Sequence, residues 1–215
     1  MNFLKAVSGI IKTNGLAAPV QPKYTVTKEH SDYEERHYEP MVWVSSTIRT
    51  TVKKNPAAEG FMKCLRYLEG NNDQKKTLYM TIPVIINIEL LGPSTDPETE
   101  IIFTTSFFLN ESLFEDGKIP QPTEEDVYIQ EIPAMDIFVR RFGGFARGQA
   151  WVEENDKLMA SLEEADKECL EEKPQTYSVG YDPPFKLMNR RNECWIVKKS
   201  QHVENTAAGL EPVTD

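Results

Sequence analysis

The residues of this chain that could carry chemistry form no recognisable catalytic set. Its histidines and cysteines are few and widely spaced: His30, His37, His202, Cys64, Cys169 and Cys194. No glycine-rich phosphate loop, Cys-x-x-Cys pair, His-Glu-x-x-His helix or Gly-x-Ser-x-Gly elbow occurs. Adjacent acids such as Glu124-Glu125 are expected to be solvated surface. The sequence therefore argues against an enzyme.

Composition and charge exclude further classes of function. The chain has 215 residues, of which 40% are hydrophobic and 27% charged, which suits one compact domain or two small ones. A net charge of -10 argues against a nucleic-acid partner, which needs a basic surface, and disfavours an anionic membrane surface for the folded body. The odd number of cysteines indicates free thiols in a reducing, cytoplasmic compartment.

The two ends are expected to be flexible tails. No acid occurs among residues 1–28, and Phe3, Leu4, Val7 and Ile10 fall near helical spacing, so residues 1–23 should form an amphipathic tail. A signal peptide would need a longer apolar run, and a mitochondrial presequence would need arginine, so mitochondrial association is the weaker alternative. Residues 201–215 should form the second tail. No stretch is apolar enough to span a membrane.

Seven segments have the composition and alternation of strands. They are Val42–Val52, Thr77–Leu91, Glu100–Leu109, Val127–Ile132, Met135–Phe142, Thr176–Tyr181 and Glu193–Lys198. In the second of these, every even position from Leu78 to Leu90 is apolar, so this face should be buried. Asn87 and Glu89 on the other face should contact water.

Two helices should interrupt the strands. Asn55-Pro56 is a start signal for the first, and Phe61, Met62, Leu65 and Leu68 then form an apolar stripe. The second should run from about Gln149 to Glu172 and stop before Pro174.

Together with the strand that carries Tyr33, Glu35 and His37, the elements follow the order strand-strand-helix-strand-strand, and then the same order again. Met41-Val-Trp-Val44 and Met135-Asp-Ile-Phe138 give a faint sequence echo of a duplication. We predict an α+β domain over residues 24–200 whose halves, about 31–110 and 126–199, form a curved antiparallel sheet or distorted β-barrel with two helices packed outside. The linker between the halves should be an exposed loop.

Three blocks carry a resemblance to a known family. They are Tyr33-Glu-Glu-Arg-His-Tyr-Glu-Pro40, Phe138-Val-Arg-Arg-Phe-Gly-Gly-Phe145 and Gly180-Tyr-Asp-Pro-Pro-Phe-Lys-Leu-Met-Asn-Arg-Arg-Asn-Glu-Cys-Trp-Ile-Val197. In this order and spacing, the chain resembles the SOUL/haem-binding protein family. The resemblance implies the same curved fold and a ligand that is haem or another porphyrin.

The resemblance also implies where the ligand binds, namely a hydrophobic cleft between the first helix and the loop of the third block. The cofactor-binding residues would be Phe61, Met62, Leu65, Tyr181, Phe185 and Met188, with Lys63, Arg66, Lys186 and Arg190 as partners for the propionates. His37 would be the axial metal ligand to the iron. Its strand also carries Glu35 on the same face, which favours a solvent-exposed histidine instead. Most of the helix stripe should simply pack on the sheet, which leaves its ends as candidates, and Arg190 or Arg191 could form an internal ion pair with Glu193 or Asp182.

The leading hypothesis is an intracellular tetrapyrrole carrier or buffer that performs no chemistry on its ligand. The alternative is a protein-interaction module that uses the helix at about 149–172, with haem binding incidental. Leu158, Leu162 and Asp166 fall on neighbouring turns of this helix, as in helices that dock into grooves. An enzyme acting on a porphyrin-like molecule is a third possibility, for which the sequence offers no acid–base pair.

Overall fold

The computed structural model describes residues 20–110, 114, 117–183 and 185–199. Most of the two predicted tails, together with Pro184 of the third block, lies outside these residues. None of the described helices is long and apolar enough to cross a membrane.

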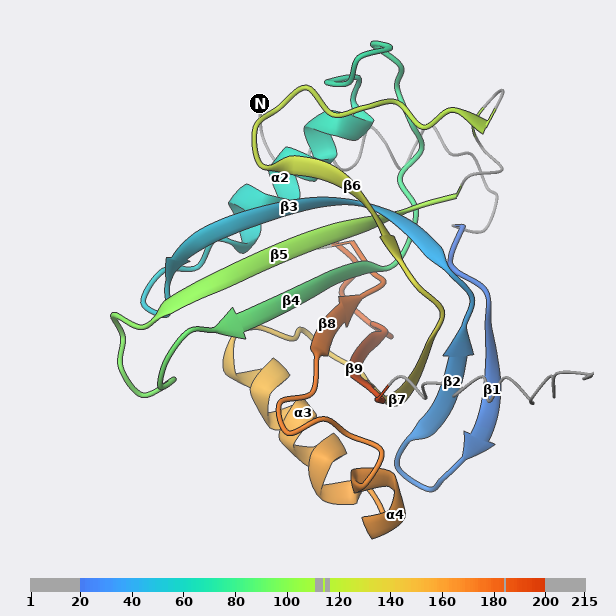
Figure 1. The fold of residues 1–215 in the computed structure, drawn as a ribbon, viewed down its shortest axis with the longest axis vertical. Coiled ribbons are helices and arrows are strands. Elements are labelled where there is room, and N and C mark those ends of the chain that lie inside the picture. Colours follow the sequence, from blue (N-terminus) through green and yellow to red (C-terminus); the bar gives the residue numbers. More distant parts are fainter. Residues whose placement is uncertain (1–19, 111–113, 115–116, 184, 200–215) are drawn as a thin grey trace, which may run out of the picture.

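One antiparallel sheet of nine strands organises the described part of the chain (Figure 1). The strand order is β1-β2-β7-β9-β8-β4-β5-β3-β6. The strands are β1 (Tyr24–Glu29), β2 (Glu34–Tyr38), β3 (Met41–Thr51), β4 (Val84–Leu90), β5 (Glu100–Leu109), β6 (Val127–Ile132), β7 (Met135–Phe142), β8 (Thr176–Gly180) and β9 (Asn192–Val197).

The strand order is symmetric about its centre once β1 is set aside. It reads β2-β7-β9-β8 on one side and β6-β3-β5-β4 on the other. The first strand of each half therefore pairs in the opposite half: β2 lies beside β7, and β6 lies beside β3. The predicted order of two strands, a helix and two strands is seen twice along the chain.

Among the described residues, three helices accompany the sheet. Helix α2 (Ala57–Leu68) contacts β3 and β5, while α3 (Gln149–Ser161) contacts β7 and β9, and the short α4 (Glu164–Lys167) follows α3. Figure 1 shows the sheet curled, with α2 and α3 outside the curve. The predicted fold class is thus confirmed.

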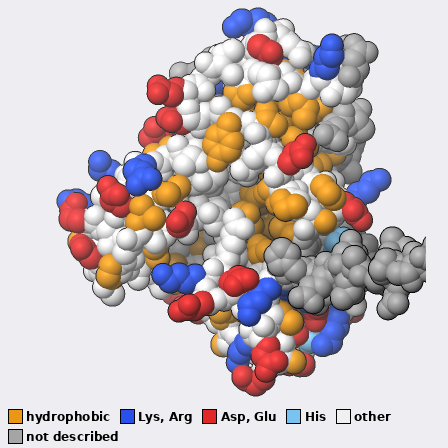
Figure 2. Space-filling model, in the orientation of Figure 1, with side chains coloured by type: hydrophobic (Ala, Val, Ile, Leu, Met, Phe, Trp, Pro, Cys, Tyr) orange, Lys and Arg blue, Asp and Glu red, His pale blue; other side chains and the backbone are white. Residues whose placement is uncertain are grey.

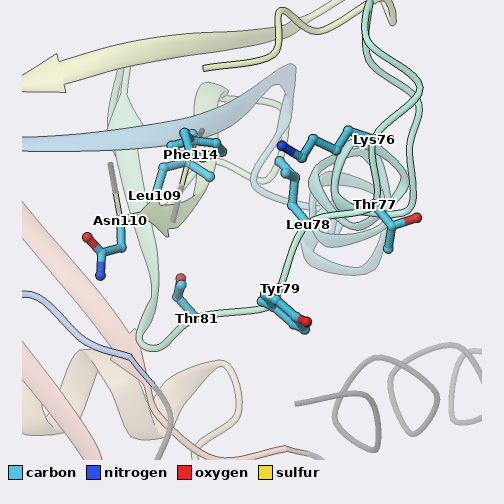
Figure 3. A pocket seen from close by; sticks show the side chains of 8 residues that line it. All are labelled: Lys76, Thr77, Leu78, Tyr79, Thr81, Leu109, Asn110 and Phe114. Carbon is cyan, nitrogen blue, oxygen red and sulfur yellow. The ribbon is translucent and has the colours of Figure 1, made fainter. Parts of the chain in front are cut away.

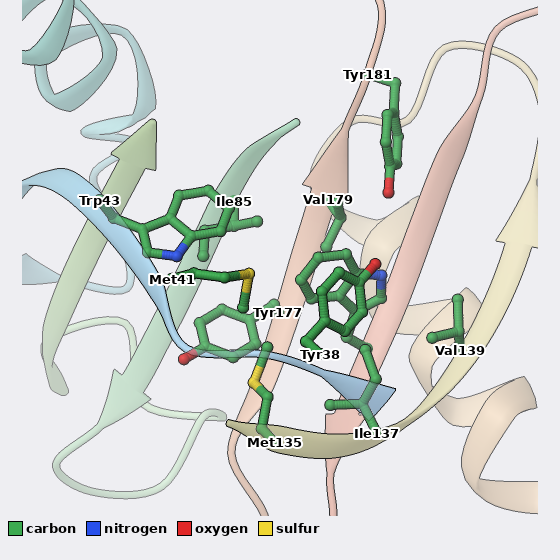
Figure 4. Close-up of a cluster of buried hydrophobic side chains, with 11 residues drawn as sticks. Tyr38, Met41, Trp43, Ile85, Met135, Ile137, Val139, Tyr177, Val179 and Tyr181 are labelled. Atoms are coloured by element: carbon green, nitrogen blue, oxygen red, sulfur yellow. The ribbon is translucent and has the colours of Figure 1, made fainter. Parts of the chain in front are cut away.

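Alternation along the strands builds one core inside the curve and two outside it. On β3, Trp43 points into the curve, whereas Val42 and Val44 point toward α2. On β9, Trp195 joins the inner cluster, and Ile196 packs with the cluster under α3. Figure 4 shows the inner cluster, to which different strands contribute aromatic side chains, among them Tyr38, Trp43 and Tyr177. Both faces of the sheet therefore carry buried apolar clusters, and the strands have apolar residues at successive positions.

The predicted strand Thr77–Leu91 is shorter in the structure. It begins only at Val84, because Pro83 has no N–H to donate to a strand ladder. The prediction that its even face is buried holds at Leu78, which is 8% exposed, and fails at the far end, where Ile88 and Leu90 are 47% and 48% exposed. On the odd face, Ile85 is 1% exposed in the inner cluster. Helix α2 covers β3 and β5, so the far end of β4 lies beyond the surface that this helix covers.

The predicted second helix is interrupted. It ends at Ser161, and the extended backbone of Leu162 and Glu163 separates α3 from α4. This break turns Leu162, Asp166 and Leu170 toward the sheet, where all three are buried.

Gly60 in α2 gives a test of how the helix packs. A Cβ atom at this position would lie 2.7 Å from Thr105 Oγ1 and 3.3 Å from Thr105 Cβ on β5. Gly→Ala in an exposed helix stabilises by about 1 kcal/mol. Here we expect the opposite sign: Gly60→Ala should lower the free energy of unfolding by about 1–3 kcal/mol because the core is overpacked. Denaturant unfolding measures the change.

The matched control removes the obstructing side chain. In the double variant Gly60→Ala/Thr105→Ala the loss should be smaller than the sum of the two single losses, since the two sites are in contact. If Gly60→Ala alone stabilises the protein, α2 does not pack this closely on β5.

Candidate functional site

The buried carboxylate of Glu193 accepts hydrogen bonds from several donors at the inner face of the sheet. Its side chain is 0% exposed. Arg36 forks onto it, with Nη1 donating to Oε2 at 2.8 Å and Nη2 donating to Oε1 at 3.1 Å. Tyr181 Oη and Trp195 Nε1 donate to Oε2 at 2.8 and 2.9 Å, and Arg191 Nη2 donates to Oε1 at 2.7 Å. Glu193 and these partners are called the Glu193 network below.

The network keeps its carboxylate charged. Burial alone raises the pKa of Glu193, but the hydrogen bonds and charge of Arg36, with the charge of Arg191, lower this pKa to about 2. Burial and the nearby Glu193 charge raise the pKa of Tyr181 well above its usual range. At neutral pH the tyrosine is therefore a proton donor to an ionised carboxylate.

The three sequence blocks converge on this network. The first block supplies Arg36 on β2, and the third supplies Glu193 on β9. The second forms β7 between them and places Arg141 Nε 3.5 Å from Glu193 Oε1. The blocks thus mark a buried ion network as well as the loop that leads into it.

That loop joins β8 to β9, and its described residues, 181–183 and 185–191, are held by their own polar groups. Arg190 Nη1 donates to the carbonyl oxygens of Pro183 and Lys186 at 2.6 and 2.8 Å, and Nη2 donates to that of Asp182 at 2.9 Å. Asp182 accepts from Lys186 Nζ at 2.7 Å and from the backbone N–H of Arg191 at 2.5 Å. The loop is therefore fixed in shape before any ligand arrives.

Large apolar side chains stand in water on this loop and on a neighbouring turn. Phe185, Leu187 and Met188 are 47%, 74% and 76% exposed. Phe145 is 47% exposed, and the Arg190 guanidinium lies 4.6 Å from the centre of its ring. These four apolar residues are called the loop patch. Three of the four residues lie close together in one loop, and the contact with Arg190 brings Phe145 beside that loop. Clustered exposed apolar side chains are typical of binding surfaces.

The pocket drawn in Figure 3 is a separate feature. Its volume is about 70 Å³. It is lined by Lys76, Thr77, Leu78, Tyr79, Thr81, Leu109, Asn110 and Phe114. Small-molecule pockets usually measure roughly 300–1,000 Å³, so a tetrapyrrole does not fit inside it. A broader concave surface is visible in Figure 2, where apolar side chains border a hollow near the centre of the drawn face.

The predicted residues on α2 serve the core to different degrees. Leu65 is 0% exposed, and the Phe61 ring packs on Phe107 with centroids 4.9 Å apart. Met62 is partly buried in the same cluster, whereas Tyr181 belongs to the inner cluster on the other face of the sheet. The structure therefore does not place the helix stripe and Tyr181 in one apolar cluster.

The predicted cations already have acidic or carbonyl partners. On α2, Lys63 Nζ lies 3.1 Å from Asp126 Oδ2, and Arg66 Nε donates to Glu124 Oε2 at 2.9 Å. In the loop, Lys186 pairs with Asp182, and Arg190 binds carbonyl oxygens. The predicted alternative of an internal ion pair is seen for Arg191, whose Nη2 lies 2.7 Å from Glu193 Oε1, whereas the partners of Arg190 are backbone carbonyls.

His37 lies on β2 and is half-exposed. Its Nδ1 is 2.9 Å from Asp136 Oδ1, and its Nε2 is 3.8 Å from Glu39 Oε1. It pairs with Asp136 at one end of β7, whereas the loop precedes Asn192, which pairs with Phe142 at the other end. Six residues of strand span roughly 20 Å. The structure thus separates His37 from the loop patch.

The face proposed for partner binding on the second helix is buried. Leu158, Leu162 and Asp166 are 0%, 3% and 8% exposed. Leu158 and Leu162 pack against Phe138 and Ile196 of the sheet. This face can reach a partner only if the helix leaves the sheet.

Sequence reasoning missed the Arg36–Glu193 pair and the part played by Phe145. A signal for the pair was present: Glu193 is followed by Cys-Trp-Ile-Val, an apolar run in which a lone carboxylate needs a buried cation. Phe145 and Arg190 lie in segments that are far apart in the sequence, so no local pattern predicts their contact.

Comparison with known proteins agrees with this architecture. The family model described as SOUL heme-binding protein matches residues 20–197. Heme-binding protein 2 of Homo sapiens is 32% identical over 197 residues, which cover 91% of this chain and 90% of that protein. Heme-binding protein 1 of Mus musculus is 30% identical over 186 residues, covering 84% and 91% of the two chains. The chain belongs to the SOUL heme-binding protein family.

The fold extends to distant proteins. A crystal structure of an uncharacterized conserved protein from Listeria innocua aligns with a TM-score of 0.55 at 8% identity, covering 77% of this chain and 91% of that one. At this identity, the likeness concerns the fold alone.

The Glu193 network should dominate stability and its dependence on pH. Glu193→Gln removes the buried carboxylate that pairs with Arg36 and leaves Glu34 as the remaining acidic partner of Arg36, so we expect a loss of about 3 kcal/mol in the free energy of unfolding at pH 7, the lower end of the range for a broken buried pair. A carboxyl with a lowered folded pKa stabilises fully above its unfolded pKa of about 4.3 and loses this contribution as the pH falls toward 2. Denaturant unfolding at pH 7 and pH 3 should show the difference from wild type narrowing at pH 3.

Glu100→Gln is the matched control, because this carboxylate is 61% exposed and pairs with Arg49 on the surface. It should change stability by less than about 0.5 kcal/mol. Equal effects at the two positions would show that Glu193 is not the buried hub described above.

Proposed function

We propose that this chain binds haem or a related tetrapyrrole on an apolar surface and carries or buffers it without altering it. Relatives that align along most of the chain are named heme-binding proteins, which supports the ligand class. The observation that carries the proposal is the loop patch. It holds apolar side chains in water on a loop whose shape is already fixed by Arg190 and Asp182.

The residues of the loop patch suit a flat apolar ligand. Phe185 and Phe145 offer aromatic faces, and Met188 and Leu187 offer flexible apolar chains. Burying apolar surface stabilises a complex by roughly 25 cal/mol per Å² before the costs of association. Apolar contact with the macrocycle therefore supplies most of the affinity.

Charge contributes less to this site. Lys186 already pairs with Asp182, and the Arg190 guanidinium donates to backbone carbonyls. A propionate would have to share these cations with their present partners, and exposed ion pairs contribute only about 0–1 kcal/mol. The predicted contribution of α2 is limited to the partly buried Phe61 and Met62, because Leu65 has no exposed surface.

The chemistry of His37 suits an iron ligand, but its position does not suit the loop patch. A histidine whose Nδ1 contacts a carboxylate, as here with Asp136, presents Nε2 to a metal. However, about 20 Å of strand separates His37 from the loop. We propose that a macrocycle held by the loop patch is not ligated by His37. Bound haem would bring an iron centre, and a carrier role requires no reaction at it.

The double variant Phe185→Asp/Met188→Asp tests the loop patch. Each change places an anion against the apolar face of the ligand, and an unpaired buried charge costs several kcal/mol. We expect affinity to fall at least tenfold, which corresponds to about 1.4 kcal/mol. Absorbance titrations with haemin and with metal-free protoporphyrin measure it. Both ligands should be affected, because the contact is with the ring.

Leu90→Asp is the control, since Leu90 is 48% exposed at the far end of β4 from the loop. It should bind both ligands as wild type does. Unchanged binding by the double variant would move the site away from the loop. Failure of the wild-type chain to give a saturable one-to-one spectral change would remove the proposed function itself.

His37→Ala separates ring contact from iron ligation. We expect haemin affinity to change by no more than about threefold, or roughly 0.6 kcal/mol, with protoporphyrin binding unchanged. A selective loss of haemin binding or a changed iron coordination spectrum, with protoporphyrin unaffected, would instead assign the axial ligand to His37.

A further inference from the structure

A second cluster of chemically capable side chains lies on the outer side of the β1–β2 hairpin. His30 follows β1, Glu35 lies on β2, and Asp166 lies on α4. His30 Nε2 is 3.0 Å from Glu35 Oε1 and 3.9 Å from Asp166 Oδ2, and the three ligand atoms all lie within 4.8 Å of one another. Their side chains are only 7%, 11% and 11% exposed.

This spacing suits a metal ion. In a tetrahedral site with bonds of about 2.1 Å, neighbouring ligand atoms lie about 3.4 Å apart. The observed separations fall on both sides of this value, so small side-chain movements would place all three atoms around one ion. Imidazole combined with carboxylates is a donor set that first-row divalent ions accept.

Each of the three side chains also has a partner of its own, as the outer groups of metal sites do. Glu163 Oε1 lies 3.6 Å from His30 Nδ1, on the side of the ring away from the cluster. Lys198 Nζ binds the other oxygen of Glu35, Oε2, while Oε1 contacts His30 and lies 3.7 Å from the exposed Lys28 Nζ. Tyr33 donates its hydroxyl proton to Asp166 and stacks on the His30 ring with centroids 4.0 Å apart.

The charge of the neighbourhood also favours a cation. Three carboxylates, those of Glu35, Asp166 and Glu163, face two ammonium groups, those of Lys28 and Lys198. With His30 neutral, the cluster therefore carries an excess of negative charge. Glu163 and Lys28 are 64% and 52% exposed, so the cluster opens to solvent on that side.

We propose that His30, Glu35 and Asp166 bind a divalent transition-metal ion, with water completing the coordination. The site is separate from the loop patch and needs no tetrapyrrole. An ion there would add a further link between the β1–β2 hairpin and α4, which the Tyr33–Asp166 hydrogen bond already joins.

Zinc is the probe for the test. The full chain, stripped of metal with a chelator, is titrated with Zn²⁺ in competition with a chromophoric zinc indicator. We expect one ion per chain, and at least a tenfold weaker affinity in His30→Gln and in Asp166→Asn. The amide oxygen introduced by Asp166→Asn can still accept the hydrogen bond from Tyr33, so this variant removes the charged ligand while keeping the structural contact. Thermal unfolding should show that zinc raises the midpoint of wild type but not of Asp166→Asn.

Glu153→Gln is the charge-matched control, because Glu153 is an exposed carboxylate on α3 outside the cluster. It should bind zinc as wild type does. Wild type that does not compete with the indicator, or His30→Gln and Asp166→Asn chains that bind as tightly as wild type, would overturn the proposal. The cluster would then be a hydrogen-bonded clasp without a metal.

Discussion

The buried ion pair between Arg36 and Glu193 is the interaction on which the inner face of the sheet depends. Two charges in an apolar core cost several kcal/mol each unless every lone pair and proton has a partner. The strands β2 and β9 that carry them are not neighbours, since β7 lies between them. The pair therefore forms only when three strands share the correct register, because a slip of β2 or of β9 by one residue would turn the charge on that strand to the outer face.

The same carboxylate links the interior to the surface loop. Tyr181 and Arg191 stand at the two ends of the loop, and both donate to Glu193. The Arg191 guanidinium also lies 3.8 Å from the centre of the Tyr181 ring, so the ends of the loop are clamped together. The shape of the loop patch is thereby tied to the integrity of the core, and damage to the core reaches the surface through these two side chains.

Local patterns predicted much of the fold. Glu100–Leu109 and Met135–Phe142 were predicted with their observed bounds because turn residues flank their alternating runs, and Asn55-Pro56 announced α2. The start of β4 was missed because it depends on Pro83, which lies within an apolar run. The break after Ser161 was missed because it depends on what the helix packs against.

The candidate site was predictable only in part. Phe185 and Met188 could be named from composition and family resemblance. The partners of Lys63 and Arg66 could not be predicted, because Asp126 and Glu124 lie 63 and 58 residues away along the chain.

The exchange of first strands between the halves also affects how the chain folds. His37 and Asp136, paired across β2 and β7, are separated by 99 residues in sequence. Contacts between residues so far apart in the sequence form late in folding. Because each half pairs with a strand of the other half, the chain should fold as one cooperative unit.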